Sequence, residues 1–551
     1  MFETEGVSGH GIVAAEAVRT GHHDDSQERV LHLAILCDRE TIASWQEQSL
    51  DRLIGSGCRI TLLRFPNAWE PEEDRTFSGS LIRRLKNRAS TLRQRAFPPM
   101  LRRNTVDLTD ATELDKAAID IMLDFRSRMT PLKLDRLPRY GIWTMTIDHA
   151  AGDAALLAVL DGFATGRRVF EVALVSTADA VSDPRVLRKG TIGSEETLER
   201  TLNDIYDAVS GWPFLALRLI QQGQGPIETD RAPALLRANK PAAGILSGML
   251  RSELRRATNL MKRWFLFETW NIGICDVPIE AFLDPAVDPD PVWLKPPRKY
   301  SYYADPFPVP DRDGELLCEF LDATTDYKGR IVRIGWDGSG NDPKVSDAID
   351  RAYHLSYPYQ FTDGGQTFCL PEAYQSGRLD LLTADAEGGA LHEVATLLEV
   401  PAVDPVILRH ADRWWLFCTL IEHQNSDLHI WYATSLTGPW TPHANNPVKT
   451  DVASARPGGT PFVSGGRLYR PAQDCSMTYG GALSLMEIIQ LDEKHFSERL
   501  VRRIVPPKGP YRDGTHTLSA CGARTLIDAK RYHFAGTLFL RKVVARVRGI
   551  R

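Results

Sequence analysis

The chain has 551 residues, of which 43% are hydrophobic, and its 66 basic and 71 acidic residues give a formal net charge of −5. This length exceeds what one hydrophobic core organises and predicts at least two domains. The near balance of charge provides no global attraction for nucleic acid, so we expect no nucleic-acid partner.

The first half of the chain begins with a strand–helix–strand pattern. Leu31–Leu36 forms an apolar run, Thr41–Ile54 has helical spacing of its apolar residues, and Arg59–Phe65 is a second β-rich run. Such a unit predicts a parallel sheet. The pattern continues with strands expected at 117–125, 141–147 and 169–175 and helices at 154–163 and 194–219. We predict an α/β domain over residues 30–220, after a disordered tail at 1–29.

The second half of the chain has a different pattern, with short β-rich segments in place of alternating strands and helices. A linker is expected at 221–258, where Gly, Pro and polar residues are frequent. Beyond it, similar β-rich segments open at a spacing of about fifty residues, which is typical of propeller blades. A β-sandwich with long loops would not explain this repetition. We predict an all-β, five-bladed propeller over 259–540 and a basic tail at 541–551. The five openings are YYADPFPV (302–309), LSYPYQF (355–361), AVDPVIL (402–408), SARPGGTPFV (454–463) and GTHTLSACGA (514–523).

A set of short motifs is distributed over the propeller segment. They are WNIGI (270–274), YYADPF (302–307), LSYPY (355–359), LPE (370–372), VDP (403–405), ARPGG (455–459), RPAQD (470–474), YGGAL (479–483) and HTLSACG (516–522). Together these motifs resemble the region in front of the catalytic domain of glucosamine inositolphosphorylceramide transferases. They are also similar to bacterial proteins in which that region follows a formyltransferase-like domain. More distantly, the openings resemble those of five-bladed glycosidases of the arabinanase and xylosidase type, in which carboxylates from three blades point into an axial funnel.

The N-terminal domain resembles the formyltransferase fold through AILCDRETIASWQ (34–46) and the strand GIWTMTI (141–147). Where related fusion proteins carry paired histidines, this chain has Thr146 and Ile147. His149 and Asp153 lie slightly downstream, where they either substitute for these groups or cap the following helix. A G-x-G-x-x-G loop is absent after the first strand. We therefore predict a degenerate enzyme fold that binds no folate formyl donor and serves packing or recognition.

Three carboxylates are candidates for glycosidic chemistry, which needs an acid for the leaving oxygen and a second carboxylate. Asp305 and Asp404 open two blades, each before a proline, and Glu372 ends a strand. The resemblance implies that Asp305 is base or nucleophile, Glu372 the acid and Asp404 the partner that raises the pKa of the acid. Alternatively, the Asp-Pro pairs are turn residues. The next blade opens with Arg456 instead of the usual Glu-Gly-Pro, which puts ordinary hydrolysis in doubt.

Further polar residues around the funnel predict a binding site for an anionic sugar, because guanidinium groups bind carboxylate or phosphate in a bidentate way. The alternative for each arginine is a salt bridge to a neighbouring acid. The predicted substrate-binding set is Arg456, Arg470, Gln473, Asp474, Tyr479 and His516.

Two basic stretches, 77–103 and 539–551, are either peripheral contacts with an anionic membrane that carries a glycolipid or solvated helices. No apolar run is long enough for a signal peptide or a membrane span. The eight scattered cysteines form no C-x-x-C pair. We expect reduced thiols, a cytoplasmic location, no metal site and no cofactor.

The leading functional hypothesis is a carbohydrate-active enzyme that makes or breaks a glycosidic bond in cell-surface glycan or glycolipid metabolism. The rival hypothesis is a non-catalytic sugar-recognition propeller that acts as a scaffold beside a transferase. Formyl transfer to an amino sugar is the third candidate, and it needs a working N-terminal site.

Overall fold

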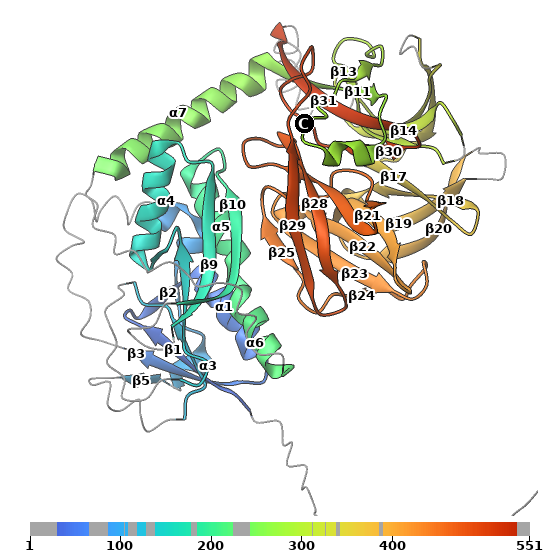
Figure 1. Ribbon diagram of the computed structural model, residues 1–551. Helices are drawn as coiled ribbons and strands as arrows, with labels where there is room; N and C mark the ends of the chain where they lie inside the picture. The colour runs from blue at the N-terminus through green and yellow to red at the C-terminus, as the bar shows by residue number, and fades with distance from the viewer. Residues whose placement is uncertain are drawn as a thin grey trace, which may run out of the picture.

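A computed structural model describes residues 30–64, 86–103, 105–107, 118–127, 138–177, 184–223, 243–310, 312–325, 327–337, 342–384 and 390–536. The expected N-terminal tail, the C-terminal basic stretch and the Gly/Pro-rich part of the linker at 224–242 lie outside these residues, apart from short flanking pieces. The described chain forms an N-terminal α/β unit and a β-rich C-terminal unit, joined by the long helix α7 (Figure 1).

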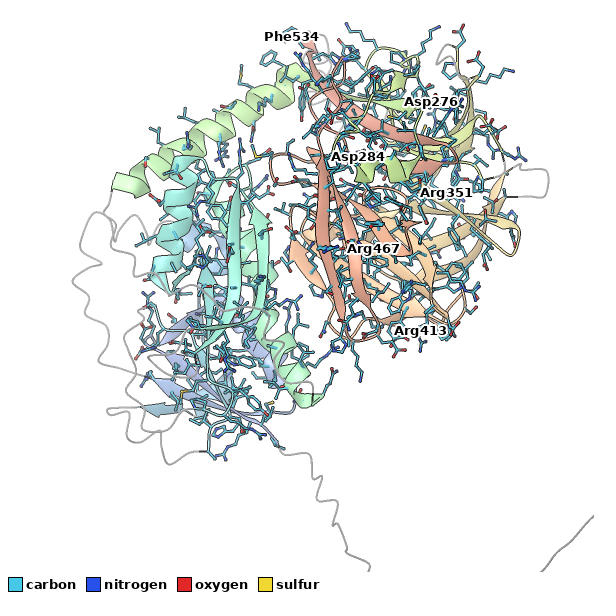
Figure 2. All side chains as sticks on the ribbon, in the orientation of Figure 1. Asp276, Asp284, Arg351, Arg413, Arg467 and Phe534 are labelled. Atoms are coloured by element: carbon cyan, nitrogen blue, oxygen red, sulfur yellow. The ribbon has the colours of Figure 1, made fainter. Side chains whose placement is uncertain are left out.

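Helix α7 (Ala243–Phe265) occupies the second half of the expected linker. The stretch 250–265 contains neither Gly nor Pro and is rich in Leu, Arg and Met, so its propensity favours a helix over an irregular linker. The helix passes over the N-terminal unit and ends at the β-rich unit, where Phe265 stacks on Phe534 with ring centroids 6.1 Å apart (Figures 1 and 2). It therefore bridges the two units.

The N-terminal unit is built on a sheet with the spatial order β10-β9-β7-β6-β1-β3-β5. The predicted parallel pairing of the first two long strands is confirmed, since His32 lies opposite Arg59 in a parallel register. Strands β5, β3, β1, β6 and β7 run parallel to one another. Strand β9 pairs with β7 in the antiparallel direction, and β10 pairs with β9 in the same way. The strands are β1 (His32–Cys37), β2 (Thr41–Ala43), β3 (Arg59–Arg64), β4 (Gln94–Ala96), β5 (Thr105–Asp107), β6 (Ile121–Asp124), β7 (Ile142–Ile147), β8 (Ala150–Ala151), β9 (Val169–Thr177) and β10 (Arg185–Gly193).

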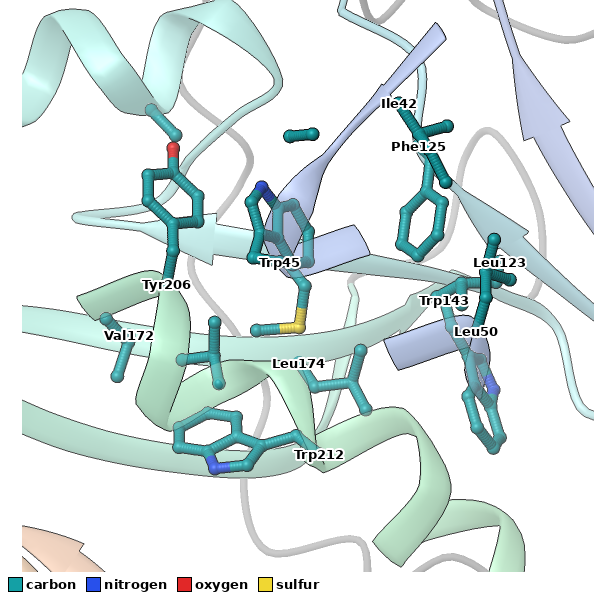
Figure 3. Close-up of a cluster of buried hydrophobic side chains, with 14 of the residues drawn as sticks. Ile42, Trp45, Leu50, Leu123, Phe125, Trp143, Val172, Leu174, Tyr206 and Trp212 are labelled. Atoms are coloured by element: carbon teal, nitrogen blue, oxygen red, sulfur yellow. The ribbon is translucent and has the colours of Figure 1, made fainter. Parts of the chain in front are cut away.

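Helices pack against this sheet around an aromatic core (Figure 3). Trp45 stacks on Tyr206 with ring centroids 5.2 Å apart and meets Phe125 edge-on at 5.4 Å. The single helix expected at 194–219 is divided into two helices, because Pro213 has no backbone N–H to donate and instead occupies the first turn of α6. The formyltransferase likeness of this unit stays a prediction. Its helices are α1 (Ser44–Ile54), α3 (Pro99–Arg103), α4 (Asp153–Thr165), α5 (Leu198–Ser210) and α6 (Trp212–Gln221).

The C-terminal unit has the predicted propeller-like arrangement of antiparallel sheets. Four are separate four-stranded sheets, with the orders β12-β11-β31-β30, β13-β14-β15-β16, β17-β18-β19-β20 and β26-β27-β28-β29. Strands β21 to β25 form a further set that continues into the N-terminal sheet. A count of five equal blades therefore stays a prediction.

The bounds of these strands agree with the repeated openings. They are β11 (Leu266–Cys275), β12 (Val292–Trp293), β13 (Ser301–Pro308), β14 (Glu315–Asp322), β15 (Gly329–Gly335), β16 (Lys344–Ile349), β17 (Ser356–Asp363), β18 (Gln366–Glu372), β19 (Leu379–Ala384), β20 (Leu391–Leu398), β21 (Ala402–His410), β22 (Arg413–Leu420), β23 (Asp427–Ala433), β24 (Thr441–Pro442), β25 (Lys449–Asp451), β26 (Phe462–Ser464), β27 (Arg467–Asp474), β28 (Ala482–Leu491), β29 (Phe496–Ile504), β30 (Leu518–Cys521) and β31 (Arg524–Phe534).

The X–Pro openings share one backbone device. Asp305, Tyr357 and Asp404 have φ values of 54°, 45° and 47°, although none is glycine. At each of them the register with the neighbouring strand shifts, as in a β-bulge. The following proline has no N–H to give to the ladder, so a bulge accommodates it. The repeated sequence motif is therefore a repeated bulge in β13, β17 and β21.

The two units are joined by a parallel β-bridge. Strand β10 pairs with β25, with Gly190 opposite Thr450 and Thr191 opposite Asp451. The Thr191 hydroxyl donates to the Asp451 carboxylate at 2.6 Å. A Cβ at Gly190 would lie 2.5 Å from the Thr450 carbonyl oxygen, so only glycine permits this approach.

Candidate functional site

A cavity of about 1280 Å³ lies between the two units. On the propeller side its wall comes from equivalent loops, each joining the second and third strands of a sheet: Tyr327 after β14, residues 421–426 after β22 and residues 475–479 after β27. On the opposite side its wall comes from α7, the segment between β10 and α5, and Arg168. The cavity thus opens over one end of the propeller.

Asp305 is held on several sides by other parts of the propeller. Its carboxylate accepts hydrogen bonds from the Thr517 hydroxyl at 2.9 Å and from the Tyr357 backbone N–H at 3.3 Å. Its own N–H donates to the Asp528 carboxylate at 3.0 Å. Burial raises the pKa of Asp305 to about 6, against the lowering effect of His516.

His516 completes this buried cluster. Its Nδ1 lies 2.7 Å from the Asp528 carboxylate, and its ring stacks on Trp270 with centroids 3.8 Å apart. Burial would lower the pKa of His516, but the carboxylates of Asp528 and Asp305 raise it above its ordinary value. The ligand atoms of the two aspartates and the histidine all lie within 4.8 Å of one another, a spacing that a small cation accepts. In this structure the three groups form an ion-paired cluster.

Asp404 is neutralised by its neighbours. Arg456 Nε lies 2.5 Å from its carboxylate, and the Gln473 amide donates to the same oxygen at 2.5 Å. The Asp404 N–H in turn donates to Glu372 at 3.0 Å. Burial, followed by the charge of Asp404, raises the pKa of Glu372 well above its usual range. Glu372 is therefore a buried acid whose protonated form is favoured by its surroundings.

Arg456 connects this buried layer to the cavity. Its Nη1 donates to the side-chain oxygens of Gln424 at 2.9 Å and Asn425 at 3.3 Å, and its guanidinium lies 4.9 Å from the ring centroid of Tyr479. These three partners line the cavity, whereas Asp305, Glu372 and Asp404 do not. The three carboxyl residues are only 5%, 5% and 3% exposed. The predicted carboxylates thus lie beneath the cavity wall, not across an open funnel.

Two predicted binding residues have structural partners instead. Arg470, 1% exposed, makes a bidentate pair with Glu498, with both N–O distances 2.6 Å. Asp474 lies 2.5 Å from Arg503. Neither lines the cavity. The salt-bridge alternative describes both residues, because their charges are already satisfied inside one sheet.

Several residues of the site were missed by sequence reasoning. Asp528 is a lone acid inside the buried part of β31, and this isolation was the signal that could have found it. Gln424, Asn425 and Tyr327 carry no such signal, because polar residues and tyrosines are ordinary in loops. Their role follows only from the way the loops meet.

The N-terminal unit has a separate cavity of about 90 Å³ at the ends of β1, β6 and β7. Its Asp153 pairs with Arg39 at 3.1 Å and Lys86 at 2.6 Å, and its Thr146 donates to the Ala173 carbonyl. His149 lies in the preceding turn and does not line this cavity. The formyl-transfer hypothesis requires a histidine in this cavity. Among the residues that the structure describes, no histidine lines it.

The predicted basic stretch 77–103 is described only from residue 86 onward. There it is helical at 86–88 and then forms a short 3₁₀ turn, β4 and α3, so the described part is not one continuous amphipathic helix. Lys86 is paired with Asp153, and Arg88 lies 3.1 Å from Glu199. Among the helices that the structure describes, none combines the length and apolarity needed to cross a membrane.

Residues 302–510 match the family described as glucosamine inositolphosphorylceramide transferase 1, N-terminal. The chain is 32% identical over 205 residues to glucosamine inositolphosphorylceramide transferase 1 of Oryza sativa subsp. japonica, which covers 36% of this chain and 28% of the relative. It is 34% identical over 207 residues to the protein of that name from Arabidopsis thaliana, covering 36% and 27%. The chain thus spans under a third of the length of these relatives.

Similar solved structures include a family 117 glycoside hydrolase from Zobellia galactanivorans, with a TM-score of 0.32, 12% identity, and coverage of 43% of this chain and 88% of that one. A family 43 glycoside hydrolase from Xanthomonas citri has a TM-score of 0.31, 13% identity, and coverage of 44% and 89%. Similarity at this level does not bear on what the chain binds or catalyses.

Proposed function

We propose that the chain recognises a carbohydrate in the cavity between its two units, in the service of cell-surface glycan or glycolipid synthesis. The observation that carries this proposal is the cavity wall over the propeller, where Tyr327, Tyr479 and Tyr532 accompany the amides of Gln424 and Asn425. Aromatic faces pack against the apolar faces of sugar rings, while amides satisfy hydroxyl groups. The relatives, which are named as glucosamine inositolphosphorylceramide transferases, support a glycolipid context.

Recognition is favoured over glycosidic chemistry because the three carboxyl groups are covered. Tyr479 lines the cavity, and Arg456 lies between Tyr479 and the Asp404 carboxylate. Arg456 holds its proton throughout the neutral range and so cannot act as the general acid. A cytoplasmic location belongs to the same proposal and is supported by the eight cysteines, all of which are free.

Glycosidic chemistry remains a second candidate, on one observation. The buried carboxyl groups have unequal proton affinities: the pKa of Asp305 is about 6, whereas that of Glu372 is raised well beyond its usual range. An acid and a base separated in this way are typical of glycosidase sites. This candidate requires Arg456 and Tyr479 to move aside. Formyl transfer has the least support, since the small N-terminal cavity is lined by no histidine.

Recognition is tested by titrating the full chain with a panel of neutral mono- and oligosaccharides by calorimetry. Tyr479→Ala should weaken binding by roughly tenfold, because stacking and cation–π contacts of this kind contribute on the order of 1 kcal/mol. The matched control is Tyr374→Ala, on the equivalent loop after β18, which does not line the cavity. Equal affinity for wild type and Tyr479→Ala would refute the assignment of the cavity.

Catalysis is tested with Asp305→Asn on the same panel, with product analysis. If the chain turns over any sugar, Asp305→Asn should abolish turnover and leave affinity nearly unchanged, because the substitution preserves shape and removes only the base. Binding without turnover in the wild type would leave recognition as the function.

A further inference from the structure

The wall of the interdomain cavity opposite the propeller carries four cationic side chains. They are Arg251, Arg255 and Lys262 of α7, together with Arg168, which directly precedes β9. The three helix residues are spaced by four and seven positions, which places them on one face of α7. Residues distant in the sequence thus bring four positive charges to one surface.

These cations are held by neutral groups. Arg251 donates to the Ala164 carbonyl at 2.8 Å, and Arg255 donates to the Ser194 hydroxyl at 2.8 Å. The Arg255 guanidinium also lies 4.3 Å from the ring centroid of Phe163. Among the described residues, no ion pair within 4.0 Å joins the four cations to an acid. The guanidinium groups are therefore positioned without being neutralised.

The charges that act on Arg255 are themselves positive. Burial lowers its pKa, and the neighbouring charges of Arg168 and Arg251 lower it further. Like charges brought together raise the electrostatic free energy of the empty site, and an anion relieves it. This repulsion favours occupation of the wall by a negatively charged group.

Five acidic residues also line the cavity, and two of them are paired with cations outside the four named above. Glu196 lies 3.4 Å from Arg200, and Glu268 lies 3.3 Å from Lys530 while accepting from Trp270. Burial, and next the charge of Glu195, raises the pKa of Asp204 to about 7, so this carboxyl group is only partly ionised in the neutral range. Glu422 is exposed on the propeller side. Among the described residues, none of these acids forms an ion pair with the four cations of the opposite wall.

We propose that Arg168, Arg251, Arg255 and Lys262 bind the phosphate or carboxylate of an anionic carbohydrate whose sugar rings lie on the propeller side of the cavity. This inference rests on the proposed carbohydrate recognition and adds the charge class of the ligand. The anionic group meets the N-terminal unit and α7, whereas the neutral part meets Tyr479, Gln424 and Asn425. Arg456 and Arg470, the predicted anion ligands, are already neutralised by Asp404 and Glu498.

The same helix carries apolar surface beside the cationic wall. Leu250, Leu254 and Met261 are 64%, 59% and 58% exposed, and Leu254 lines the cavity. Such a surface is what the acyl chains of a lipid-linked ligand need, and a soluble sugar phosphate does not use it. The anionic group can therefore belong to a lipid-linked ligand or to a soluble sugar phosphate, and the experiment below distinguishes these two sources.

The test uses the full chain with glucose 6-phosphate, glucose and inorganic phosphate in calorimetry. Phosphatidylcholine vesicles with and without a minority of phosphatidylinositol are compared by co-sedimentation. Arg255→Gln and Arg168→Gln should each weaken binding of glucose 6-phosphate by roughly tenfold or more, because charge-assisted hydrogen bonds are lost. Glucose binding should be unchanged. The matched control is Arg256→Gln, which removes an α7 charge that does not line this cavity.

The outcomes separate this inference from the proposed function. An equal loss of glucose and glucose 6-phosphate binding in Arg255→Gln would overturn it, because the arginine would then only support the fold. Absence of binding to every anionic probe would overturn it too, even if neutral sugars bind. Arginine-dependent phosphate binding without any sugar binding would retain the anion site and refute carbohydrate recognition. Selective binding of phosphatidylinositol vesicles identifies a lipid-linked source, and binding of glucose 6-phosphate alone identifies a soluble one.

Discussion

The arginines beneath the propeller wall and those on α7 occupy opposite electrostatic situations. Arg470 and Arg456 are buried, and each lies against a carboxylate at 2.5–2.6 Å. Arg251 and Arg255 face the cavity and donate to a carbonyl and a hydroxyl. A buried guanidinium needs a counter-charge because water cannot solvate it. An accessible cluster without a counter-charge is the one that can receive an anion from outside.

The strongest test of this comparison removes the most deeply buried cation. Arg470→Met should lower the free energy of unfolding by about 3–5 kcal/mol, because Glu498 then remains buried with a weakened partner set. Urea denaturation measures it. Arg467→Ala is the control: Arg467 is labelled on the outer surface of the propeller, and its substitution should cost about 0.5 kcal/mol or less (Figure 2). Equal effects at the two positions would contradict the comparison.

The buried cluster should also make stability depend on pH in a way that the α7 cations do not. The pKa of Asp305 rises from 3.8 to about 6 on folding, so the folded chain retains this proton to a higher pH. Its contribution is present below the unfolded pKa and is lost as pH rises through about 6; the raised pKa of His516 acts in the same direction.

Asp305→Asn removes this titration. Between pH 4 and 7 the stability difference, wild type minus variant, should therefore fall by about 2.4 kcal/mol. Denaturation curves of both proteins across this range measure it. A difference that stays constant with pH would show that the Asp305 carboxyl titrates alike in the folded and unfolded chain.

A smaller effect is expected at Arg456, which is buried but bonded to cavity residues. Arg456→Ala should cost about 2 kcal/mol, since Gln473 still donates to Asp404. Arg456→Lys keeps the charge but not the geometry, and should recover only part of the loss. Thermal unfolding of the two variants distinguishes charge from shape, and full recovery by lysine would mean that only the charge matters.

The smallest effect has the opposite sign. Arg255→Gln should change stability by about 0.5 kcal/mol or less and should raise it, because it relieves repulsion from Arg168 and Arg251. Thermal unfolding at low salt gives the largest shift, and added salt should remove it. A destabilisation of several kcal/mol would place Arg255 with the structural arginines.

The sequence predicted those parts of the molecule that depend on local pattern. The X–Pro openings at Asp305, Tyr357 and Asp404 marked the bulged strands, because the proline that requires the bulge directly follows each of these residues in the sequence. The ion-pair partner of Arg470 could not be predicted, since Glu498 lies 28 positions away on another strand. The cationic wall could not be predicted for the same reason, because its charges come together only where α7 lies beside Arg168 of the N-terminal unit.

The β10–β25 bridge also has a consequence for how the chain can be divided. An unpaired strand edge is a template on which other chains add strands and aggregate. Gly190 and Thr191 close such an edge next to Thr450 and Asp451. The N-terminal unit therefore shields the propeller from self-association, and a propeller produced without it would carry an uncovered edge at β25.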